Sequence, residues 1–261
     1  MDSLKEILYV NCPFSLLKER YLDLVLRYKI NPEIGIDGVC LDTYSIEDFR
    51  DIARVLRSAN LKVTLHAPFM DLSLGSPEPE IRKVSRKRLE QFIYLIPILR
   101  PKVAVFHSGW DEKRYWGMRE QWLKESLDFW RWISRSLRKE GVWMNIENVF
   151  EKTPQELSTL IQYIGEDNIG ICLDVGHLSV FSRVPLREWV LSLSPLIRQL
   201  HLHDNDGSQD HHRALGAGKI NFKELFNLIK MHRIDIGAIT LEPHREEDLW
   251  PSLQYLSRLK Y

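Results

Sequence analysis

In the stretch Ile169–His177, with the sequence IGICLDVGH, an apolar run of strand length ends in an aspartate and a histidine, two residue types that bind metal ions. Five further apolar runs end in the same way: TLHAP (64–68), VAVFHSG (103–109), VWMNIEN (142–148), LIRQLHLHD (196–204) and GAITLEP (237–243). Isolated acids and histidines carry little information. Six strands that place such a residue at the same relative position predict one site lined from several directions.

Short apolar runs alternate with amphipathic stretches eight times along the chain. The expected strands are Ile7–Asn11, Glu33–Gly38, Lys62–His66, Lys102–His107, Val142–Glu147, Ile169–Asp174, Ile197–His203 and Ile236–Glu242. The expected helices include Ser15–Tyr28, Glu80–Leu99, Gln121–Lys139, Pro154–Ile164 and Phe222–Met231. This alternation is typical of βαβ units, and a closed barrel of eight units needs about 250 residues. We therefore expect an α/β fold in which residues 1–261 form a single domain, a (β/α)8 TIM barrel.

An open, doubly wound sheet is the structural alternative. Such a sheet binds its ligands at one switch point, from two or three strands. Only a closed barrel brings the carboxyl ends of six strands to one point, and that face carries the active site in barrel enzymes. The sequence therefore favours the barrel.

Charge and cysteine content narrow the class of protein. Lys and Arg together number 36, as do Asp and Glu, so the formal net charge is zero and does not indicate a nucleic-acid or acidic-membrane partner. Cys12, Cys40 and Cys172 lie far apart in apolar runs, so we expect buried thiols rather than disulfides or a cysteine zinc site. The N-terminus has no signal-peptide pattern and no apolar window is long enough for a membrane span, so we expect a cytoplasmic protein.

Nine residues at or just after these strands are candidate metal ligands: His66, His107, Glu147, Asp174, His177, His201, Asp210, His212 and Glu242. A carboxylate in a partly dry barrel mouth is costly unless it is paired or bound to a cation. Histidine with carboxylate, and without cysteine, suits Zn²⁺, Mn²⁺, Co²⁺ or Fe²⁺. The nine residues together predict a divalent metal site. His203, His211 and His244 lack this support, and we expect them beside the site or in solvent.

At these residues the chain resembles the xylose isomerase-like TIM-barrel superfamily, which includes endonuclease IV and the sugar-phosphate isomerases and epimerases. The matching stretches are HAPFMDLSLGSPEPEIRKVS from His66, FHSGW with His107, NIENVF with Glu147, ICLDVGH with Asp174 and His177, HLHDNDG with His201, DHHRALGAGKI with Asp210 and His212, and TLEPH with Glu242. They cover most of the chain in the order of the superfamily, but they are less specific within it.

One branch of this resemblance implies a sugar or sugar-phosphate isomerase or epimerase. Four residues match the ligands of one Mn²⁺ or similar ion in ketose epimerases: Glu147, Asp174, His201 and Glu242. In that chemistry the two glutamates, Glu147 and Glu242, remove and return a proton on the carbon beside a carbonyl. By the same resemblance, His177 and Arg213 match positions that hold substrate oxygens.

The other branch implies an endonuclease IV-like phosphodiester hydrolase, which cleaves abasic DNA with a trinuclear zinc cluster. All nine candidate ligands match the positions of that cluster, and clustered metals suit attack on a phosphodiester. Phe69 and Met70 fall where that family has an aromatic–aliphatic pair that wedges into DNA. Three departures count against this branch. The loop Val39–Ile46 contains no arginine, Leu72 stands where asparagine is typical, and the chain has no basic surplus to bind phosphates.

Two loops supply further candidate contacts to a substrate, in addition to Phe69. Gly216 and Gly218 precede a helix start after the seventh strand, where barrels often bind phosphate through backbone N–H groups, although glycines also suit a simple tight turn. Trp110 and Trp116 follow the fourth strand and are able to stack on a sugar ring or a base. Packing at the barrel rim is the commoner role of such tryptophans.

We therefore expect a metal-dependent enzyme with one to three Zn²⁺ or Mn²⁺ ions per chain. The missing arginine and the neutral charge favour an isomerase or epimerase acting on a small sugar or sugar phosphate, with the abasic-DNA hydrolase as the alternative. A non-catalytic barrel that binds metal or sugar is a third hypothesis, and the presence of both Glu147 and Glu242 counts against it.

Overall fold

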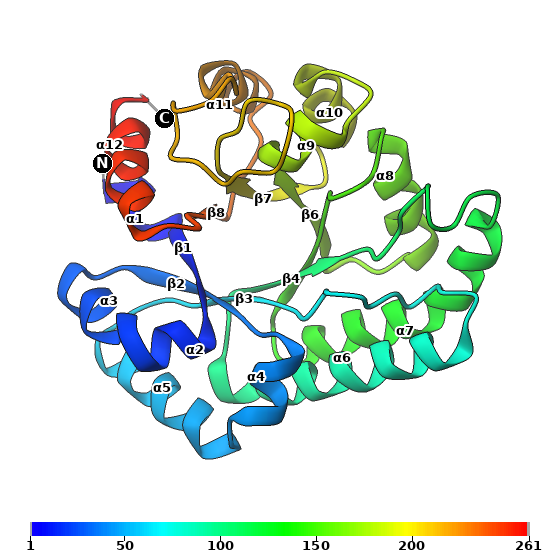
Figure 1. Ribbon diagram of the computed structural model, residues 1–261, viewed down its shortest axis with the longest axis horizontal. Helices are drawn as coiled ribbons and strands as arrows, with labels where there is room; N and C mark the ends of the chain where they lie inside the picture. Colours follow the sequence, from blue (N-terminus) through cyan, green and yellow to red (C-terminus); the bar gives the residue numbers. More distant parts are fainter. Residues whose placement is uncertain (1, 260–261) are drawn as a thin grey trace.

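The computed structural model describes residues 2–259, and within them eight parallel strands close into a barrel surrounded by helices (Figure 1). The strands are β1 (Leu8–Pro13), β2 (Asn31–Gly35), β3 (Thr64–His66), β4 (Val103–His107), β5 (Trp143–Glu147), β6 (Ile169–Asp174), β7 (Ile197–Leu202) and β8 (Ala238–Leu241). Each strand pairs in parallel with the next, and β1 pairs with β8. The expected (β/α)8 TIM barrel is confirmed, and all eight expected strands are present with small differences at their ends.

The helices that cover the barrel follow the strands in the expected order. They are α1 (Asp2–Ile7), α2 (Phe14–Leu16), the π-helical turn η1 (Leu17–Tyr21), α3 (Leu22–Tyr28), α4 (Gly38–Thr43), α5 (Ile46–Ser58), α6 (Pro79–Leu99), α7 (Arg119–Lys139), α8 (Pro154–Ile164), α9 (Val175–Phe181), α10 (Leu186–Leu193), α11 (Phe222–Met231), the 3-10 turn η2 (Glu246–Asp248) and α12 (Leu249–Arg258). Side-chain caps start several of them, because a helix leaves its first N–H groups without partners. Ser45 and Thr153 form capping boxes at α5 and α8, and Asn221 caps α11.

Side chains of each strand alternate between an outer apolar layer and the barrel interior. The outward-facing residues and the inner faces of the helices form one large buried cluster, with Trp130, Trp189 and Phe106 among its fully buried side chains. The interior is unusual for a barrel, because polar residues lie there beneath the mouth, where branched apolar residues dominate in most TIM barrels. All three cysteines are buried and free, as expected.

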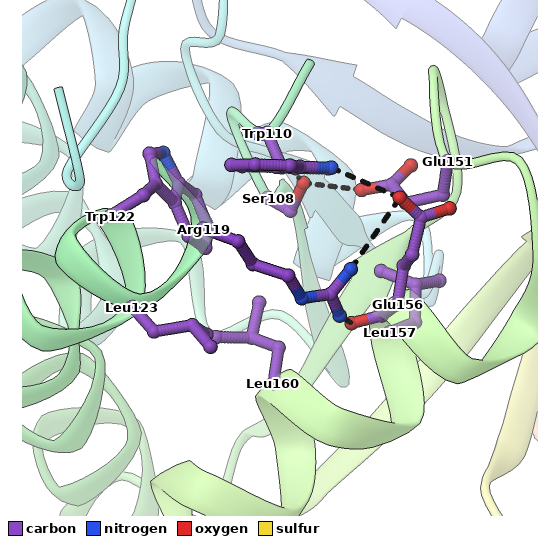
Figure 2. Close-up of a pocket in the computed structure, with 9 residues that line it drawn as sticks. All are labelled: Ser108, Trp110, Arg119, Trp122, Leu123, Glu151, Glu156, Leu157 and Leu160. Atoms are coloured by element: carbon purple, nitrogen blue, oxygen red, sulfur yellow. Dashed lines mark hydrogen bonds and ion pairs between the residues drawn. The ribbon is translucent and has the colours of Figure 1, made fainter. Parts of the chain in front are cut away.

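The loop after β4 packs Trp110 against the rim (Figure 2). Its ring lies 5.4 Å from that of Trp122, the guanidinium of Arg119 lies 5.7 Å from its ring centre, and its Nε1–H donates to Glu156 Oε1 at 3.1 Å. Trp110 is only 7 % exposed and packs at the rim, the commoner role of such tryptophans, and its contact with a substrate stays a prediction. Trp116, in contrast, is largely exposed.

Within the described residues, no helix combines the length and the apolar character that a membrane span requires.

Candidate metal centre

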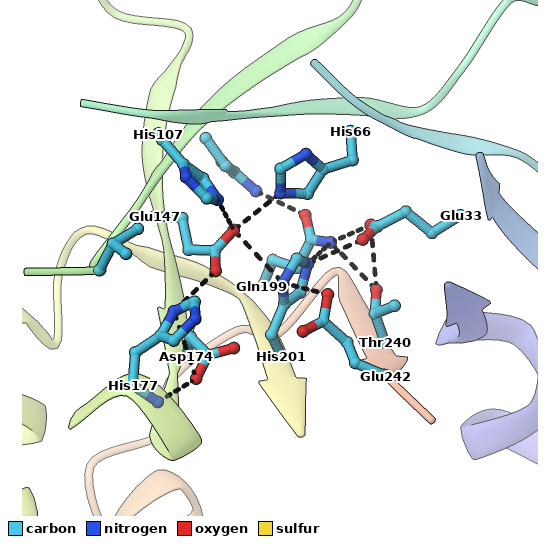
Figure 3. A network of polar contacts seen from close by, with 12 residues as sticks. Glu33, His66, His107, Glu147, Asp174, His177, Gln199, His201, Thr240 and Glu242 are labelled. Atoms are coloured by element: carbon cyan, nitrogen blue, oxygen red, sulfur yellow. Dashed lines mark hydrogen bonds and ion pairs between the residues drawn. The ribbon is translucent and has the colours of Figure 1, made fainter. Parts of the chain in front are cut away.

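The carboxyl ends of β3 to β8 meet at one mouth of the barrel and carry the strand-borne candidates inward (Figure 3). His66, His107, Glu147 and Asp174 are the last residues of β3 to β6, His201 lies in β7, and Glu242 follows β8. The other three candidates come from the connections. His177 lies in the first turn of α9, where its backbone N–H donates to Asp174 at 2.6 Å, and Asp210 and His212 lie in the loop after β7.

Three groups of donor atoms lie at spacings that suit metal ions. Two ligands that bind one ion tetrahedrally at about 2.0 Å lie roughly 3.3 Å apart. The first group, subsite A, consists of His66, His107 and Glu147. His66 Nε2 lies 3.1 Å and His107 Nε2 lies 3.5 Å from Glu147 Oε2. His66 Nδ1 lies 3.0 Å from the carbonyl oxygen of Ala67, which only accepts, so the proton belongs on Nδ1 and Nε2 is free to bind.

The four residues expected to hold a single ion, Glu147, Asp174, His201 and Glu242, define subsite B. Short spacings join His201 to Glu147 and Glu242, whereas the donor atoms of Asp174 lie with those of Glu147 and His177. His201 Nδ1 lies 3.0 Å from Glu242 Oε1 and 3.4 Å from Glu147 Oε2. Asp174 is held in place by Asn148, because the Asn148 amide donates to the Asp174 carbonyl and accepts from its backbone N–H, both at 2.8 Å. Glu147 therefore belongs to two subsites at once.

Subsite C consists of His177, Asp210 and His212, outside the barrel axis. His177 Nε2 lies 3.2 Å and His212 Nε2 lies 3.1 Å from Asp210 Oδ2. Backbone carbonyls again face the other ring nitrogens: His177 Nδ1 lies 3.0 Å from Asn148 O, and His212 Nδ1 lies 3.1 Å from Glu242 O. His212 adopts a left-handed backbone with φ of 48°, a strained conformation for a residue with a side chain.

Orphaned polar atoms indicate that the cluster suits a bound cation. Asp174 Oδ2, His201 Nδ1, Asp210 Oδ1 and both ring nitrogens of His203 are buried without a hydrogen-bond partner. Leaving such atoms unsatisfied costs about 1–3 kcal/mol each. Imidazole with carboxylate is a donor set that divalent zinc, manganese and iron accept, so the residues fit ions of this kind.

The electrostatics of the protein alone show how strongly the site demands positive charge. Burial by itself would raise the pKa of Glu147, but the imidazoles of His201 and His107 hold it well below its usual range. The pKa of Asp210 is likewise lowered, since the hydrogen bonds from His177 and His212 outweigh its burial. Burial lowers the pKa of His107 despite the nearby Glu147 carboxylate. The imidazoles thus supply the positive charge that keeps these carboxylates ionised, a charge that a bound cation would also supply.

Two residues of the centre escape the strand-end pattern. His203 is buried rather than solvent-facing, with Nε2 3.2 Å from Asp174 Oδ1 and its ring stacked on that of His212 at 3.7 Å. Its ring nitrogens lie close to the donor atoms of His177, Asp210 and His212, so His203 is a further candidate at subsite C. Glu33, on β2, is fully buried below subsite B, with Oε1 2.9 Å from His201 Nε2. Glu33 has a signal in the sequence, a charged residue inside a strand, and His203 directly follows β7, two positions after His201.

The remaining expected contacts to a substrate differ in their outcome. Phe69 stacks on His107 with ring centres 4.1 Å apart, so it borders subsite A. Arg213 forms an ion pair with Asp206 at 3.0 Å. The backbone N–H groups of Gly216 and Gly218 each donate to a carboxylate of the chain itself, Asp204 Oδ2, at 2.9 Å. An internal carboxylate therefore accepts from these N–H groups, as suits a tight turn, and phosphate binding at the glycines stays a prediction.

Comparison with known proteins identifies the family of the chain. A family model described as "Xylose isomerase-like TIM barrel" matches residues 32–259. The uncharacterized protein MJ1614 of Methanocaldococcus jannaschii is 32% identical over 196 residues, 70% of this chain and 74% of that protein. The probable endonuclease 4 of Mycobacterium leprae is 24% identical over 212 residues, 77% of this chain and 81% of that protein.

Two solved structures share the fold over almost the whole chain. The TTHB071 protein from Thermus thermophilus, soaked with ZnCl2, has a TM-score of 0.80 at 28% identity and covers 97% of both chains. A D-tagatose 3-epimerase-like protein has a TM-score of 0.81 at 23% identity, over 97% of this chain and 96% of the other.

Proposed function

Because the chain belongs to the xylose isomerase-like TIM barrel family, which includes enzymes, we propose that it is a metal-dependent phosphodiester hydrolase with divalent ions in subsites A, B and C. The net charge and the loop after β2 favour an isomerase or epimerase instead. The proposal rests on the geometry around Glu147.

Glu147 lies at the meeting point of four imidazole rings. Its Oε2 lies 3.1 Å from His66 Nε2, 3.5 Å from His107 Nε2 and, on the inner side, 3.4 Å from His201 Nδ1. Its Oε1 lies 3.1 Å from His177 Nδ1. A base that removes a proton from carbon needs an oxygen free to reach the substrate and a pKa near the working pH. Glu147 is 1 % exposed and both of its oxygens face imidazoles, so it suits a metal ligand shared by subsites A and B better than an epimerase base.

Ions at these positions would supply Lewis acidity and charge compensation for the attack of water on a phosphodiester. The residues of the chain would hold the ions and orient the ligands. Glu147 belongs to both subsite A and subsite B, and backbone carbonyls keep the Nε2 atoms of His66, His177 and His212 directed at the cluster. Two histidines and one carboxylate in subsites A and C suit zinc and leave room for a further ligand at each.

Duplex DNA with an abasic site is the substrate we propose to test first. Phe69 and Met70 are 41 % and 72 % exposed beside subsite A, an exposed pair that suits contact with unstacked bases. The similarity to a probable endonuclease 4 supports the same choice.

Epimerisation of a ketose is the second candidate, favoured by two observations. The turn after β2 folds into the short helix α4 (Gly38–Thr43), which contains no arginine. The net charge of the chain is zero, so its composition does not indicate strong electrostatic binding to DNA. The four residues of subsite B are also the set expected for a single ion beside a carbonyl.

Two measurements on the same preparation separate the candidates. We expect about three zinc ions per chain by elemental analysis of protein purified without chelator, and nicking of an abasic-site duplex that His107→Ala reduces at least about 100-fold. His232→Ala, an exposed histidine after α11, is the matched control and should retain full activity and metal. One ion per chain, no nicking, and solvent-deuterium exchange into a ketose that Glu242→Gln abolishes would reject the hydrolase and establish the epimerase.

A further inference from the structure

His201 differs from the other histidines of the cluster in what faces its outer ring nitrogen. Backbone carbonyls face Nδ1 of His66, His177 and His212, so these rings present Nε2 to the centre. His201 is turned the other way. Its Nδ1 faces subsite B, and its Nε2 lies 2.9 Å from a carboxylate oxygen, Glu33 Oε1. A side chain, rather than the backbone, therefore faces the nitrogen that decides its tautomer.

The directions of the hydrogen bonds below His201 follow from counting donors (Figure 3). Asn145 Nδ2 donates to Gln199 Oε1 at 3.1 Å, which fixes the Gln199 amide so that its NH2 group faces Glu33. Gln199 Nε2 then donates to Glu33 Oε2 at 2.7 Å. The hydroxyls of Thr64 and Thr240 donate to the same oxygen at 2.8 and 3.0 Å. Three donors therefore hold Oε2 and leave Oε1 for His201.

The proton of His201 follows from the same count. Gln199 has two N–H groups, and one donates to Glu33 while the other has Thr240 Oγ1 at 3.2 Å as an acceptor. Gln199 Nε2 also lies 3.2 Å from His201 Nε2, but without a spare hydrogen. A bare lone pair on Nε2 would face the lone pairs of a carboxylate oxygen at 2.9 Å, which is repulsive. A proton on Nε2 turns that contact into an attraction, and at Nδ1, which faces Glu242 Oε1 at 3.0 Å, a cation in subsite B would take the place of the proton.

We propose that Glu33 is a positioning residue of the metal centre, whose buried carboxylate holds the His201 proton on Nε2 and so directs the Nδ1 lone pair into subsite B. The proposal rests on the metal-binding part of the proposed function. Carboxylates that orient a ligating histidine in this way typically change metal affinity by about 10–100-fold when they are removed. Glu33 is fully buried, and it lies on β2, a strand that carries none of the nine candidate ligands.

The test is Glu33→Gln, which has the same shape but places an amide in the carboxylate position. Its oxygen keeps the bonds from Thr64, Thr240 and Gln199, so its NH2 group faces His201 Nε2 and drives the ring proton to Nδ1. We expect Zn²⁺ titration against a chromophoric chelator to show about 10–100-fold weaker binding at one site of the chain only. We also expect ¹⁵N spectra of labelled histidine in the zinc-loaded wild type to show the His201 proton on Nε2 and none on Nδ1.

Thr64→Val is the matched control, because it removes one hydrogen bond from the same carboxylate without changing the contact with His201. Its zinc affinity should stay within about 2-fold of the wild type, and an equal loss in both variants would overturn the positioning role in favour of a structural one. A Glu33→Gln protein with wild-type affinity would also overturn it. If that variant does not fold, the wild-type spectrum decides, since a proton on Nδ1 contradicts the proposal. Both readouts use Zn²⁺ without substrate, so failure to cleave DNA leaves them unaffected.

Discussion

Glu151 makes the stability of this protein depend on pH in a way that one substitution isolates. The side chain is 2 % exposed and lies beside the cavity lined by Trp110 and Arg119 (Figure 2). Val149 N–H donates to its Oε2 at 2.8 Å, and the Ser108 side chain shares a hydrogen bond with its Oε1. Burial raises the pKa of Glu151 to about 7, although these two hydrogen bonds oppose the shift. Within residues 2–259, Glu151 forms no ion pair with a basic side chain.

The size of the effect follows from that pKa. Glu151 titrates near 4.5 in the unfolded chain and near 7 in the folded one. Between these values the folded state binds more protons, so the free energy of unfolding falls as the pH rises. The stabilising contribution is complete below pH 4.5 and is lost as the pH passes 7. At about 1.4 kcal/mol per pH unit, this group lowers the stability by about 2–3 kcal/mol between about pH 5 and pH 8.

Glu151→Gln mimics the protonated carboxyl and removes this titration. Urea unfolding of both proteins at several pH values between about 5 and 8 gives the difference in free energy of unfolding, in which other titrating groups cancel. We expect the variant to gain about 2–3 kcal/mol over the wild type across this range as the pH rises. A difference that stays constant would refute the reasoning, because it would mean that Glu151 ionises in the folded state as it does in the unfolded one.

Two substitutions test contacts around the metal centre. In Gly176→Ala the added Cβ would lie 1.9 Å from His203 Cε1, so we expect a loss of about 1–3 kcal/mol in urea unfolding and weaker zinc binding; unchanged values for both would mean that His203 has space to move. The Asp204 carboxylate accepts hydrogen bonds from several backbone N–H groups, and Asp204→Asn leaves at least one of them without an acceptor. We expect this variant to lose at least about 3 kcal/mol of stability at neutral pH. The control is Asp235→Asn at an exposed position, which should change the stability little. Equal stability of the two variants would contradict this account.

The fold was predictable because hydrophobic period and element length repeat eight times. The stretch Ile169–Asp174 is a strand with the expected ends, and the capping residues Ser45, Thr153 and Asn221 start helices where the sequence indicates. The nine candidate ligands lie together because parallel strands bring their carboxyl ends to one face. The partners of Trp110 and of the glycines at 216 and 218 were not predictable, because Glu156 and Asp204 accept from their N–H groups and distant partners of this kind leave no local pattern.

His203, expected beside the site or in solvent, is buried beside the site, two positions after His201. The sequence does not predict the space that the His203 ring occupies. That room comes from Gly176, which lies directly against His203, and from the left-handed backbone of His212, which sets the two rings parallel at 3.7 Å. Both depend on the path of two loops that the barrel brings together.

The residue two positions before each ligand lies one layer deeper in the barrel, since strand side chains alternate. At four of six strands that residue is polar: Thr64, Asn145, Gln199 and Thr240. Apolar branched residues fill this layer in most TIM barrels, and a buried polar network is costly unless every member is satisfied. Glu33 completes the network from β2 and turns its remaining oxygen to His201. The polar layer suits the candidate ligands above it, because under the positioning role proposed for Glu33 a carboxylate faces one imidazole at a depth where no backbone carbonyl does.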